Sequence, residues 1–400
     1  MTQAFLVDAL RTPVGKHNGI LKAVRPDDMA ALVLKRIVER NELDPGLIDE
    51  VYMGCANQAG EDNRNVARMA VLLAGLPHSV PAVTINRLCA SGMEAAAIAF
   101  RAIASGEGHC YIAGGVESMT RAPFSVPKLA GGFDFGNLTA WDTTLGWRYP
   151  NPAMKELFPL ESMGETAENI YERWKIPREL QDQFAFESHQ KAVMAHERGL
   201  FEEEIIPVEI PQRKGDPIVV NRDEGPRKDT TLEKLATLRP AFRKGGTVTA
   251  GNSSSLNDGA AALLICSEKF IKDHNLKPLA RIVASASAGV DPRYMGIGPV
   301  DAVEKLLART GVTKFEIGLW EINEAFAVQA LAVLAELDPH IDRVNSKGGA
   351  IAIGHPLGMS GARILGTLAR SMRDAGTRWG IASLCVGVGQ GQAILLENMN

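Results

Sequence analysis

Two stretches of the chain, ASGMEAAAIAFRAI at residues 90–103 and MSGARILGTLARSM at residues 359–372, share a Ser-Gly pair followed by small and apolar residues. We interpret each Ser-Gly pair as the cap of a helix. Each stretch precedes an apolar segment that ends in glycines, HCYIAGG at 109–115 and IASLCVGVGQG at 381–391. The repeat predicts an internal duplication, with the two helices near a pseudo-two-fold axis and each beside its own sheet.

The segments around this repeat follow the same order in both halves. A β-branched strand pattern, a helical pattern and a second strand pattern succeed one another at 4–9, 26–43 and 48–56, and again at 280–286, 298–312 and 317–327. The fold class is therefore α/β, built from two duplicated βαβ-type halves. The stretch TVTAGNSSSLNDGAAAL (247–263) is expected to be a polar loop before a helix, with Asn257 or Asp258 as the helix cap.

The middle of the chain has a different composition, rich in proline, aromatic and charged residues. It contains one clear helical pattern, at 178–201, and is too long for an ordinary connection, so we interpret it as an inserted loop domain. The predicted domains are an N-terminal half (1–120 plus 250–275), the loop domain (121–249) and a C-terminal half (276–400).

Composition narrows the class of protein. The chain has 400 residues, 46% of them hydrophobic, and a net charge of −4, which gives no general attraction to nucleic acid or anionic membranes. Its apolar runs are shorter than the roughly 20 residues that span a bilayer, and no secretory signal is evident. The five cysteines are odd in number, widely spaced and without a CxxC pair, which favours reduced thiols in the cytoplasm over a disulfide framework or a metal site.

Cys89 and His355 are the first candidates for chemistry. Cys89 directly precedes a predicted helix, whose N-terminus favours a thiolate and lowers the thiol pKa; a buried structural cysteine is the alternative. His355 lies in GGAIAIGHPLGMSGAR (348–363), a glycine-rich turn. A histidine there could activate the thiol as a general base, or it could simply stabilise the loop.

Three further stretches carry polar or reactive groups. Cys385 ends a predicted strand and opens VGVGQG, whose glycines could free backbone N–H groups for an oxyanion; a dinucleotide loop is disfavoured because GxGxxG is absent. Asn323 and Glu324 follow another strand, where the amide could orient a water and the carboxylate a histidine, or the two could be an internally satisfied loop pair. Nine basic residues between 213 and 244 form either a phosphate site or a solvated surface.

Taken in order, these motifs resemble those of the thiolase family along nearly the whole chain. The resemblance implies a layered αβαβα thiolase fold and an acyltransferase that cleaves a 3-oxoacyl-CoA with coenzyme A, or runs the reverse Claisen condensation. It also implies that coenzyme A is a substrate and that no metal or other cofactor is needed. The matching motifs are NRLCASG, GGVESMTRAPF, TVTAGNSSSLNDGAAA, EINEAFA, GGAIAIGHPLG and LCVGVGQG.

The resemblance also implies roles for individual residues. Cys89 matches the acylated nucleophile, His355 the histidine that activates it, and Cys385 the cysteine that shuttles the α-proton. Asn323 matches the asparagine that holds a water in a first oxyanion hole together with His355. The backbone N–H groups of Cys89 and Gly387 correspond to a second oxyanion hole.

Coenzyme A contacts follow from the same resemblance. Ser254 matches a serine that contacts the pantetheine, Met163 a methionine beside it, and Arg227 an arginine near the nucleotide. Lys234, Ala325 and Phe326 are assigned to the same site. The family further implies a homodimer or homotetramer, with coenzyme A binding and subunit contacts in the loop domain.

Three features bear on the substrate. Ser162 stands where biosynthetic acetoacetyl-CoA thiolases tend to carry histidine, which favours a degradative enzyme. Met359 stands where many relatives have cysteine or alanine. The stretch 142–155, DTTLGWRYPNPAMK, is similar to the loop of 3-oxoadipyl-CoA thiolases.

Several alternatives remain open from the sequence. A biosynthetic thiolase, a decarboxylative condensing enzyme and a non-catalytic acyl-CoA-binding protein are the competing functions. The second cysteine, Cys385, argues against decarboxylative relatives, and the intact set of Cys89, His355 and Cys385 argues against a non-catalytic protein.

Overall fold

The computed structural model describes residues 2–128, 131 and 136–399. Within these residues one ten-stranded sheet runs through both halves of the chain. Nine strands form a continuous path, and β2 (Gly15–Lys16) pairs with β10 at its side. The path runs in the order β12 (Ile317–Ile322), β13 (Trp379–Val386), β14 (Gln390–Asn398), β11 (Ala280–Gly289), β1 (Ala4–Arg11), β10 (Asn257–Ser267), β5 (Cys110–Ser118), β3 (Glu50–Gly54) and β4 (Ala82–Ile85).

The two halves of this sheet have the same topology, which confirms the predicted duplication. In the order β3-β5-β10-β1 and again in the order β12-β13-β14-β11, the first pair is parallel and the other pairs are antiparallel. A register shift follows Leu6 in β1 and Ile282 in β11, at equivalent positions. Each helix was expected beside its own sheet; the two half-sheets in fact join into one, because β1 and β11 pair with each other about the Phe5–Arg281 pair, on the local two-fold axis.

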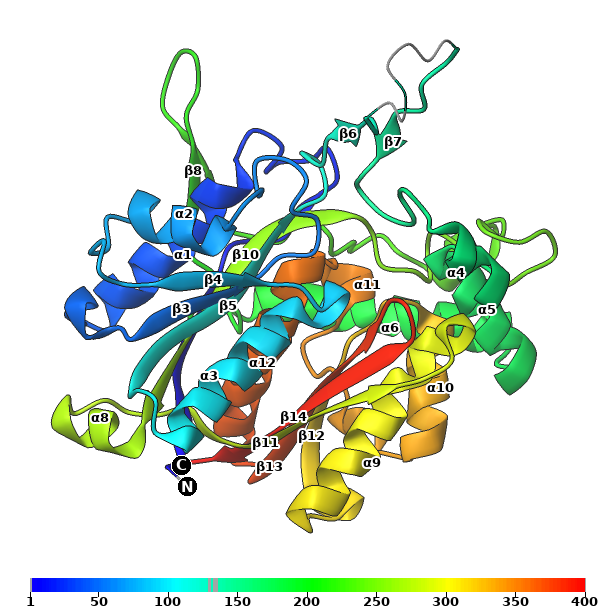
Figure 1. Ribbon diagram of the computed structural model, residues 1–400. Coiled ribbons are helices and arrows are strands. Elements are labelled where there is room, and N and C mark those ends of the chain that lie inside the picture. Colours follow the sequence, from blue (N-terminus) through cyan, green and yellow to red (C-terminus); the bar gives the residue numbers. More distant parts are fainter. Residues whose placement is uncertain (1, 129–130, 132–135, 400) are drawn as a thin grey trace.

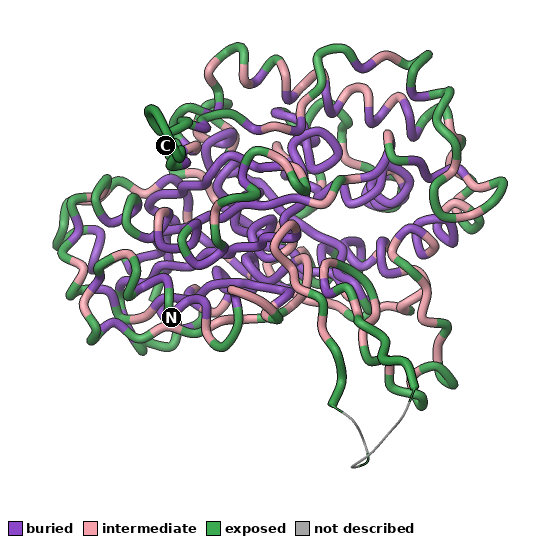
Figure 2. The backbone as a smooth tube through the Cα atoms, turned by 90° about the horizontal axis from the view of Figure 1, so that it is seen from above, coloured by how far each residue is buried: buried purple, intermediate pink, exposed green. Residues whose placement is uncertain are grey.

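Helices cover both faces of each half, in the predicted αβαβα arrangement (Figure 1). The central layer is formed by α3 (Ser91–Ser105) and α12 (Leu357–Ala375). The outer layer of the N-terminal half contains α1 (Pro26–Arg40) and α2 (Val66–Leu73), and that of the C-terminal half α9 (Gly298–Thr310) and α10 (Ala327–Leu337). Buried residues accordingly fill the middle of the molecule, with exposed loops at its edge (Figure 2).

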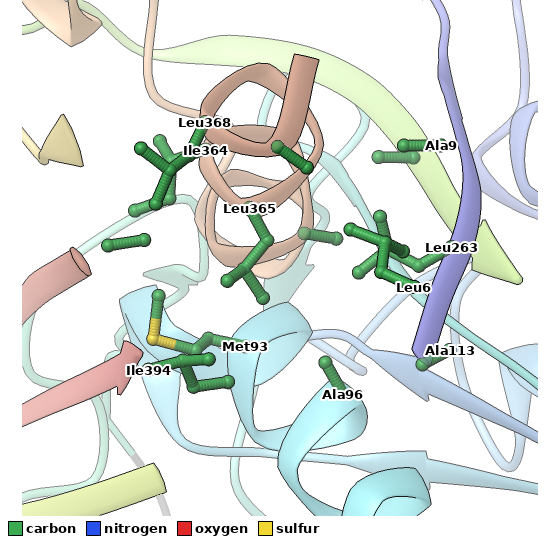
Figure 3. Close-up of a cluster of buried hydrophobic side chains, with 14 of the residues drawn as sticks. Leu6, Ala9, Met93, Ala96, Ala113, Leu263, Ile364, Leu365, Leu368 and Ile394 are labelled. Atoms are coloured by element: carbon green, nitrogen blue, oxygen red, sulfur yellow. The ribbon is translucent and has the colours of Figure 1, made fainter. Parts of the chain in front are cut away.

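The central layer is where the two halves share a hydrophobic core. Met93 and Ala96 of α3 meet Leu365 of α12, and strands from both halves contribute Leu6 and Ile394 (Figure 3). Burial of this apolar surface is the main stabilising term that holds one half against the other. One helical stretch, Leu88–Ser105, is long and apolar enough to cross a bilayer, and it is this core helix with the turn before it.

The segment Asn257–Ser267 is the strand β10, so the expected helix with Asn257 or Asp258 as its cap was wrong. Its alternate residues pack into different layers: Ala262 and Leu264 face the outer helices, whereas Leu263 and Ile265 face the central layer. Because both faces of this strand are buried, its sequence is a continuous apolar run without the alternation that marks a half-exposed strand.

The two Ser-Gly pairs bring the central helices into close contact. A Cβ on Gly92 would lie 2.6 Å from the carbonyl oxygen of Gly358, and one on Gly361 would lie 2.4 Å from the backbone nitrogen of Met93. The glycines therefore permit the close approach of α3 and α12. The prediction that the serines are helix caps was wrong, since α3 and α12 have no side-chain cap.

Residues 121–249 contact both halves. The longest helix of this segment, α6 (Arg178–Glu197), packs against α10 and α11 (Ala350–Ile353) of the C-terminal half. The hairpin of β8 (Val208–Ile210) and β9 (Ile218–Val220) adds to the core under α1 and α2. The segment also contains β6 (Phe124–Ser125), β7 (Trp141–Asp142), α4 (Pro152–Leu157), α5 (Met163–Trp174) and α7 (Leu232–Ala236), and α8 (Glu268–Asp273) follows β10.

Candidate active site

A cavity of about 340 Å³ brings together the predicted catalytic residues from three distant parts of the chain. Cys89, His355 and Cys385 all line it, as does Gly387. Cys89 lies two residues before α3 and His355 two residues before α12, so the two central helices have their N-termini at this cavity. That arrangement follows from the duplication, because the two helices are equivalent elements of the two halves.

Cys89 lies in a 3-10 turn, Leu88–Ala90, between β4 and α3. Leu88 has a φ of 47°, a strained conformation for a residue with a branched side chain. The turn is held by its neighbours: Asn86 Oδ1 accepts from Leu88 N, and Ser91 Oγ donates to the Leu88 carbonyl. The serine of the first Ser-Gly pair therefore holds the turn that positions Cys89.

Burial raises the pKa of the Cys89 thiol to about 11. The backbone N–H groups of Gly387 and of Cys89 itself act in the opposite direction, because both favour a negative charge on the sulfur. The expectation of a lowered pKa was therefore wrong, since desolvation outweighs these groups. At this pKa the thiol form predominates near pH 7, so a base would have to remove the proton before the sulfur could act as a nucleophile.

His355 occupies a turn that only a glycine at position 354 allows. Gly354 has a φ of 117°, and a Cβ there would lie 2.6 Å from the Asn257 amide carbon. The same Asn257 accepts a hydrogen bond from the His355 backbone N–H, at 2.9 Å. β10 of the N-terminal half thus fixes the backbone of a histidine that belongs to the C-terminal half.

Hydrogen bonds assign the tautomer of the His355 ring. The Ser360 hydroxyl donates its proton to the Pro356 carbonyl, at 2.8 Å, and also lies 2.6 Å from His355 Nδ1. With that proton on the Pro356 carbonyl, the hydroxyl accepts from an Nδ1–H, and we assign the free lone pair of the ring to Nε2 on this basis. Nε2 lies 3.4 Å from Asn323 Nδ2, an N–H donor, which agrees with this assignment.

Burial lowers the pKa of His355 to about 3, and the Arg363 cation acts in the same direction. The resting imidazole is therefore neutral and can accept a proton at Nε2. Ser360 was missed as a partner of this histidine because the sequence suggested only a helix cap; its position five residues after His355, in the first turn of α12, was the available signal.

Asn323 and Glu324 have different environments. Asn323 is buried beside His355, and within the described residues its Oδ1 has no hydrogen-bond partner. The Glu324 carboxylate accepts from the Ser188 hydroxyl and the Asn345 amide, so it holds α6 and the loop after α10, not the histidine. The structural alternative is therefore correct for Glu324, whereas Asn323 lies where it can act with His355.

Cys385 is fully buried near the end of β13, and burial together with the neighbouring Cys89 raises its thiol pKa. The VGVGQG stretch forms the hairpin turn between β13 and β14, which excludes a dinucleotide loop. Val388 and Gly389 both have positive φ in this turn, which leaves the Gly387 N–H free to point at the Cys89 sulfur. One hairpin thus supplies both the second thiol and a backbone N–H group directed at the first.

Glu117, at the end of β5, was not singled out from the sequence. Its carboxylate accepts from the backbone N–H groups of Ala56, Asn57 and Gly358, and so joins the loop after β3 to the start of α12. Ligand-type atoms of Cys55, Asp62 and Glu117 lie within 4.8 Å of one another. These atoms already take part in internal hydrogen bonds, since the Cys55 thiol donates to Asp62.

Two family models cover almost the whole chain. The model described as "Thiolase, N-terminal domain" matches residues 4–269, and "Thiolase, C-terminal domain" matches residues 276–398. The chain belongs to the thiolase family. It is therefore an acyltransferase that acts on acyl-CoA substrates.

Individual relatives agree over the full length of this thiolase. It is 55% identical to the beta-ketoadipyl-CoA thiolase of Pseudomonas aeruginosa, over 99% of both chains, and 51% identical to the 3-oxoadipyl-CoA/3-oxo-5,6-dehydrosuberyl-CoA thiolase of Escherichia coli, over all of both. Among solved structures, the acetyl-CoA acetyltransferase of Bacillus anthracis superimposes with a TM-score of 0.94 at 42% identity. That match covers 100% of this chain and 99% of the other.

The residues that the thiolase resemblance assigned to coenzyme A fall into two groups. Four of them line the cavity: Met163, Ser254, Ala325 and Phe326. Arg227 and Lys234 are exposed and are not among the lining residues, and Lys234 pairs with Asp229 at 2.9 Å. Their assignment stays a prediction.

Met359 and Ser162, two of the features that bear on the substrate, lie in different surroundings. Met359 is fully buried in the central core, where its sulfur packs against Gly259, and it does not line the cavity. Ser162 is the N-cap of α5, with Glu165 completing the capping box, and so directly precedes Met163.

Proposed function

We propose that this thiolase cleaves 3-oxoadipyl-CoA with coenzyme A in a degradative pathway, releasing acetyl-CoA and succinyl-CoA. The observation that carries the catalytic part is the meeting of Cys89, His355 and Cys385 in one cavity. The substrate part rests on the names of the relatives at 51% and 55% identity. The presence of a second thiol beside the first supports thiolysis over a decarboxylative condensation, which needs no such proton shuttle.

The first half-reaction breaks the carbon–carbon bond. His355 Nε2 takes the Cys89 proton, and the thiolate attacks the C3 ketone. The tetrahedral oxyanion collapses, the C2–C3 bond breaks, and the electron pair leaves on the acetyl-CoA enolate. Cys385 protonates C2 of that enolate, so acetyl-CoA departs and the succinyl group stays on Cys89 as a thioester.

The second half-reaction returns the enzyme to its resting state. The Cys385 thiolate takes the proton of the incoming coenzyme A, whose sulfur attacks the succinyl thioester. Cys89 leaves as a thiolate and recovers its proton from His355. Every proton and electron pair is exchanged among the two cysteines, the histidine and the substrates, so the proposed cycle requires neither a metal nor a redox cofactor.

Two groups of hydrogen-bond donors are proposed to stabilise the two negatively charged oxygens, that of the tetrahedral intermediate and that of the enolate. The backbone N–H groups of Cys89 and Gly387 are proposed to hold the tetrahedral oxyanion, which is supported by their common direction towards the Cys89 sulfur. Once protonated at Nε2, His355 becomes a donor, and with a water held by Asn323 it is proposed to hold the enolate oxygen. Preorganised donors of this kind typically contribute about 10²–10³-fold in rate each.

The remaining parts of the proposal concern the assembly. We propose that the enzyme is cytoplasmic, which the five free thiols support, and that it works as a homodimer or homotetramer. The loop domain at 121–249 is proposed to carry the coenzyme A contacts and part of the subunit interface.

The test is a thiolysis panel with purified enzyme and coenzyme A. We expect the highest kcat/KM with 3-oxoadipyl-CoA, and acetyl-CoA and succinyl-CoA in equal amounts by mass spectrometry. Acetoacetyl-CoA and 3-oxohexanoyl-CoA serve as comparison substrates, and Cys89→Ser as the inactive control. Efficient cleavage of acetoacetyl-CoA with no cleavage of 3-oxoadipyl-CoA would refute the proposed substrate.

A further inference from the structure

Arg148 is a cation of the active-site cavity that lacks an anionic partner. It lies between β7 and α4, is half-buried, and lines the same cavity as Cys89. No carboxylate of the described residues forms an ion pair with it. By comparison, Arg87 pairs with Glu94, and Arg121 with Glu61.

The guanidinium of Arg148 is nevertheless fixed in place. Its Nη1 donates to the Thr143 carbonyl at 3.1 Å, and its Nη2 to the Asn57 carbonyl at 2.8 Å. The Asn57 side chain donates to the same Thr143 carbonyl at 2.6 Å. Glu117 in turn accepts a hydrogen bond from the Asn57 backbone N–H. Arg148 is therefore connected by hydrogen bonds, through Asn57, to Glu117.

The two carbonyl contacts use only part of the donor capacity of the side chain. A guanidinium has five N–H groups in one plane, so three remain for a ligand, enough for a two-point contact with a carboxylate. Glu117 also lines the cavity, and its two oxygens accept three backbone N–H groups. The cavity therefore has a carboxyl group whose oxygens are satisfied by backbone N–H groups, and a cation that has no anionic partner among the described residues.

We propose that Arg148 binds the terminal carboxylate of the acyl chain and so selects 3-oxoacyl-CoA substrates that end in a carboxylate over those that end in a methyl group. This inference rests on the proposed function. A chain that ends in a methyl group would leave the guanidinium without an anion, whereas the 3-oxoadipyl chain, and the succinyl group left on Cys89, would supply the missing anion.

The test compares two substrates that differ only at the far end of the chain. For Arg148→Met we expect kcat/KM with 3-oxoadipyl-CoA to fall by about 100-fold, the scale of a charge-assisted two-point contact. With 3-oxohexanoyl-CoA it should change by less than about threefold, which also shows that the variant folds. Arg148→Lys keeps the charge without the planar fork and should lose an intermediate amount. Lys155→Met, an exposed change of charge in the same segment, should leave both substrates unaffected.

The outcomes separate this inference from the proposed function. If the wild-type enzyme does not favour 3-oxoadipyl-CoA over 3-oxohexanoyl-CoA, the proposed function fails, and this inference fails with it. If the wild type has the preference and Arg148→Met keeps it, only the role of Arg148 is wrong. Parallel losses with both substrates, in the Met and Lys variants alike, would show that Arg148 has a purely structural role and overturn the inference.

Discussion

Ser360 Oγ lies 2.6 Å from His355 Nδ1 and 2.8 Å from the Pro356 carbonyl oxygen, an arrangement in which the serine gives its proton to the carbonyl and accepts one from Nδ1. The serine therefore decides which ring nitrogen of the histidine is free to act as a base. It also belongs to the Ser-Gly pair that begins the packing of α12 against α3. One short motif thus connects the duplicated fold to the chemistry of the site.

Removing the Ser360 hydroxyl should impair catalysis more than binding. In Ser360→Ala the imidazole can place its proton on Nε2, so a smaller fraction of the enzyme has a base facing Cys89. We expect kcat to fall by about tenfold, the scale of one lost hydrogen bond of roughly 1–1.5 kcal/mol, with KM little changed. Ser371→Ala is the matched control, because this buried serine lies on the same helix and its hydroxyl has no partner within the described residues. Equal kcat values in the two variants would contradict the role of Ser360.

The low pKa of His355 predicts how stability depends on pH. Its pKa is about 3 in the folded protein, against an ordinary value of 6.5 when unfolded. Between these values the unfolded chain binds a proton that the folded protein does not. The free energy of unfolding should therefore fall, as the pH is lowered through this window, by about 1.4 kcal/mol per pH unit on account of this group.

The measurement is urea unfolding of the wild type and His355→Gln at several pH values from 6 to 4.5. Other titrating groups contribute equally to both proteins, so the difference between the two isolates His355. We expect the variant to lose less stability on acidification. Parallel pH dependences would mean that His355 titrates normally in the fold.

Close packing of the central helices predicts that replacing either contact glycine by alanine destabilises the protein. Alanine favours a helix over glycine by about 1 kcal/mol, yet a Cβ on Gly92 would lie 2.6 Å from a carbonyl oxygen of the other half. Gly92→Ala should therefore lower the free energy of unfolding, by about 1–3 kcal/mol, and Gly361→Ala by a similar amount. Urea or thermal unfolding of both variants provides the check. Stabilisation in either variant would show that the helices separate more readily than their contacts indicate.

Much of the fold could be predicted from the sequence because the two halves of the chain repeat the same order of strand and helix patterns. The order of strand and helix patterns, and the likeness of 90–103 to 359–372, give the α/β class and the duplication. The joining of the two sheets through β1 and β11 could not be predicted, because strand pairing depends on contacts distant in sequence. The strand at 257–267 was mistaken for a helix because burial on both faces removes the alternation that identifies strands.

Only part of the candidate site could likewise be predicted from the sequence. The positions of Cys89, His355 and Cys385 could be predicted, since each lies in a distinctive motif. Their partners could not: Ser360 looks like a helix cap, and Glu117 looks like the end of a buried strand. The pKa of Cys89 was expected to fall because the helix end is visible in the sequence, whereas the burial that raises it appears only in the fold.

The central claim is that the two thiols have different tasks, Cys89 as the acylated nucleophile and Cys385 as the proton shuttle. The most direct test measures thiolysis and the transfer of a radiolabelled acetyl group from acetyl-CoA onto the protein, side by side in Cys385→Ser and Cys89→Ser. General acid–base catalysis is worth about 10²–10⁴-fold, so Cys385→Ser should lose thiolysis on that scale while still acquiring the label, which peptide mass spectrometry should locate at Cys89. Cys89→Ser should lose both, because a serine hydroxyl is a far weaker nucleophile than a thiol. Near-normal thiolysis in Cys385→Ser, or label located mainly on Cys385 in the wild type, would contradict the account.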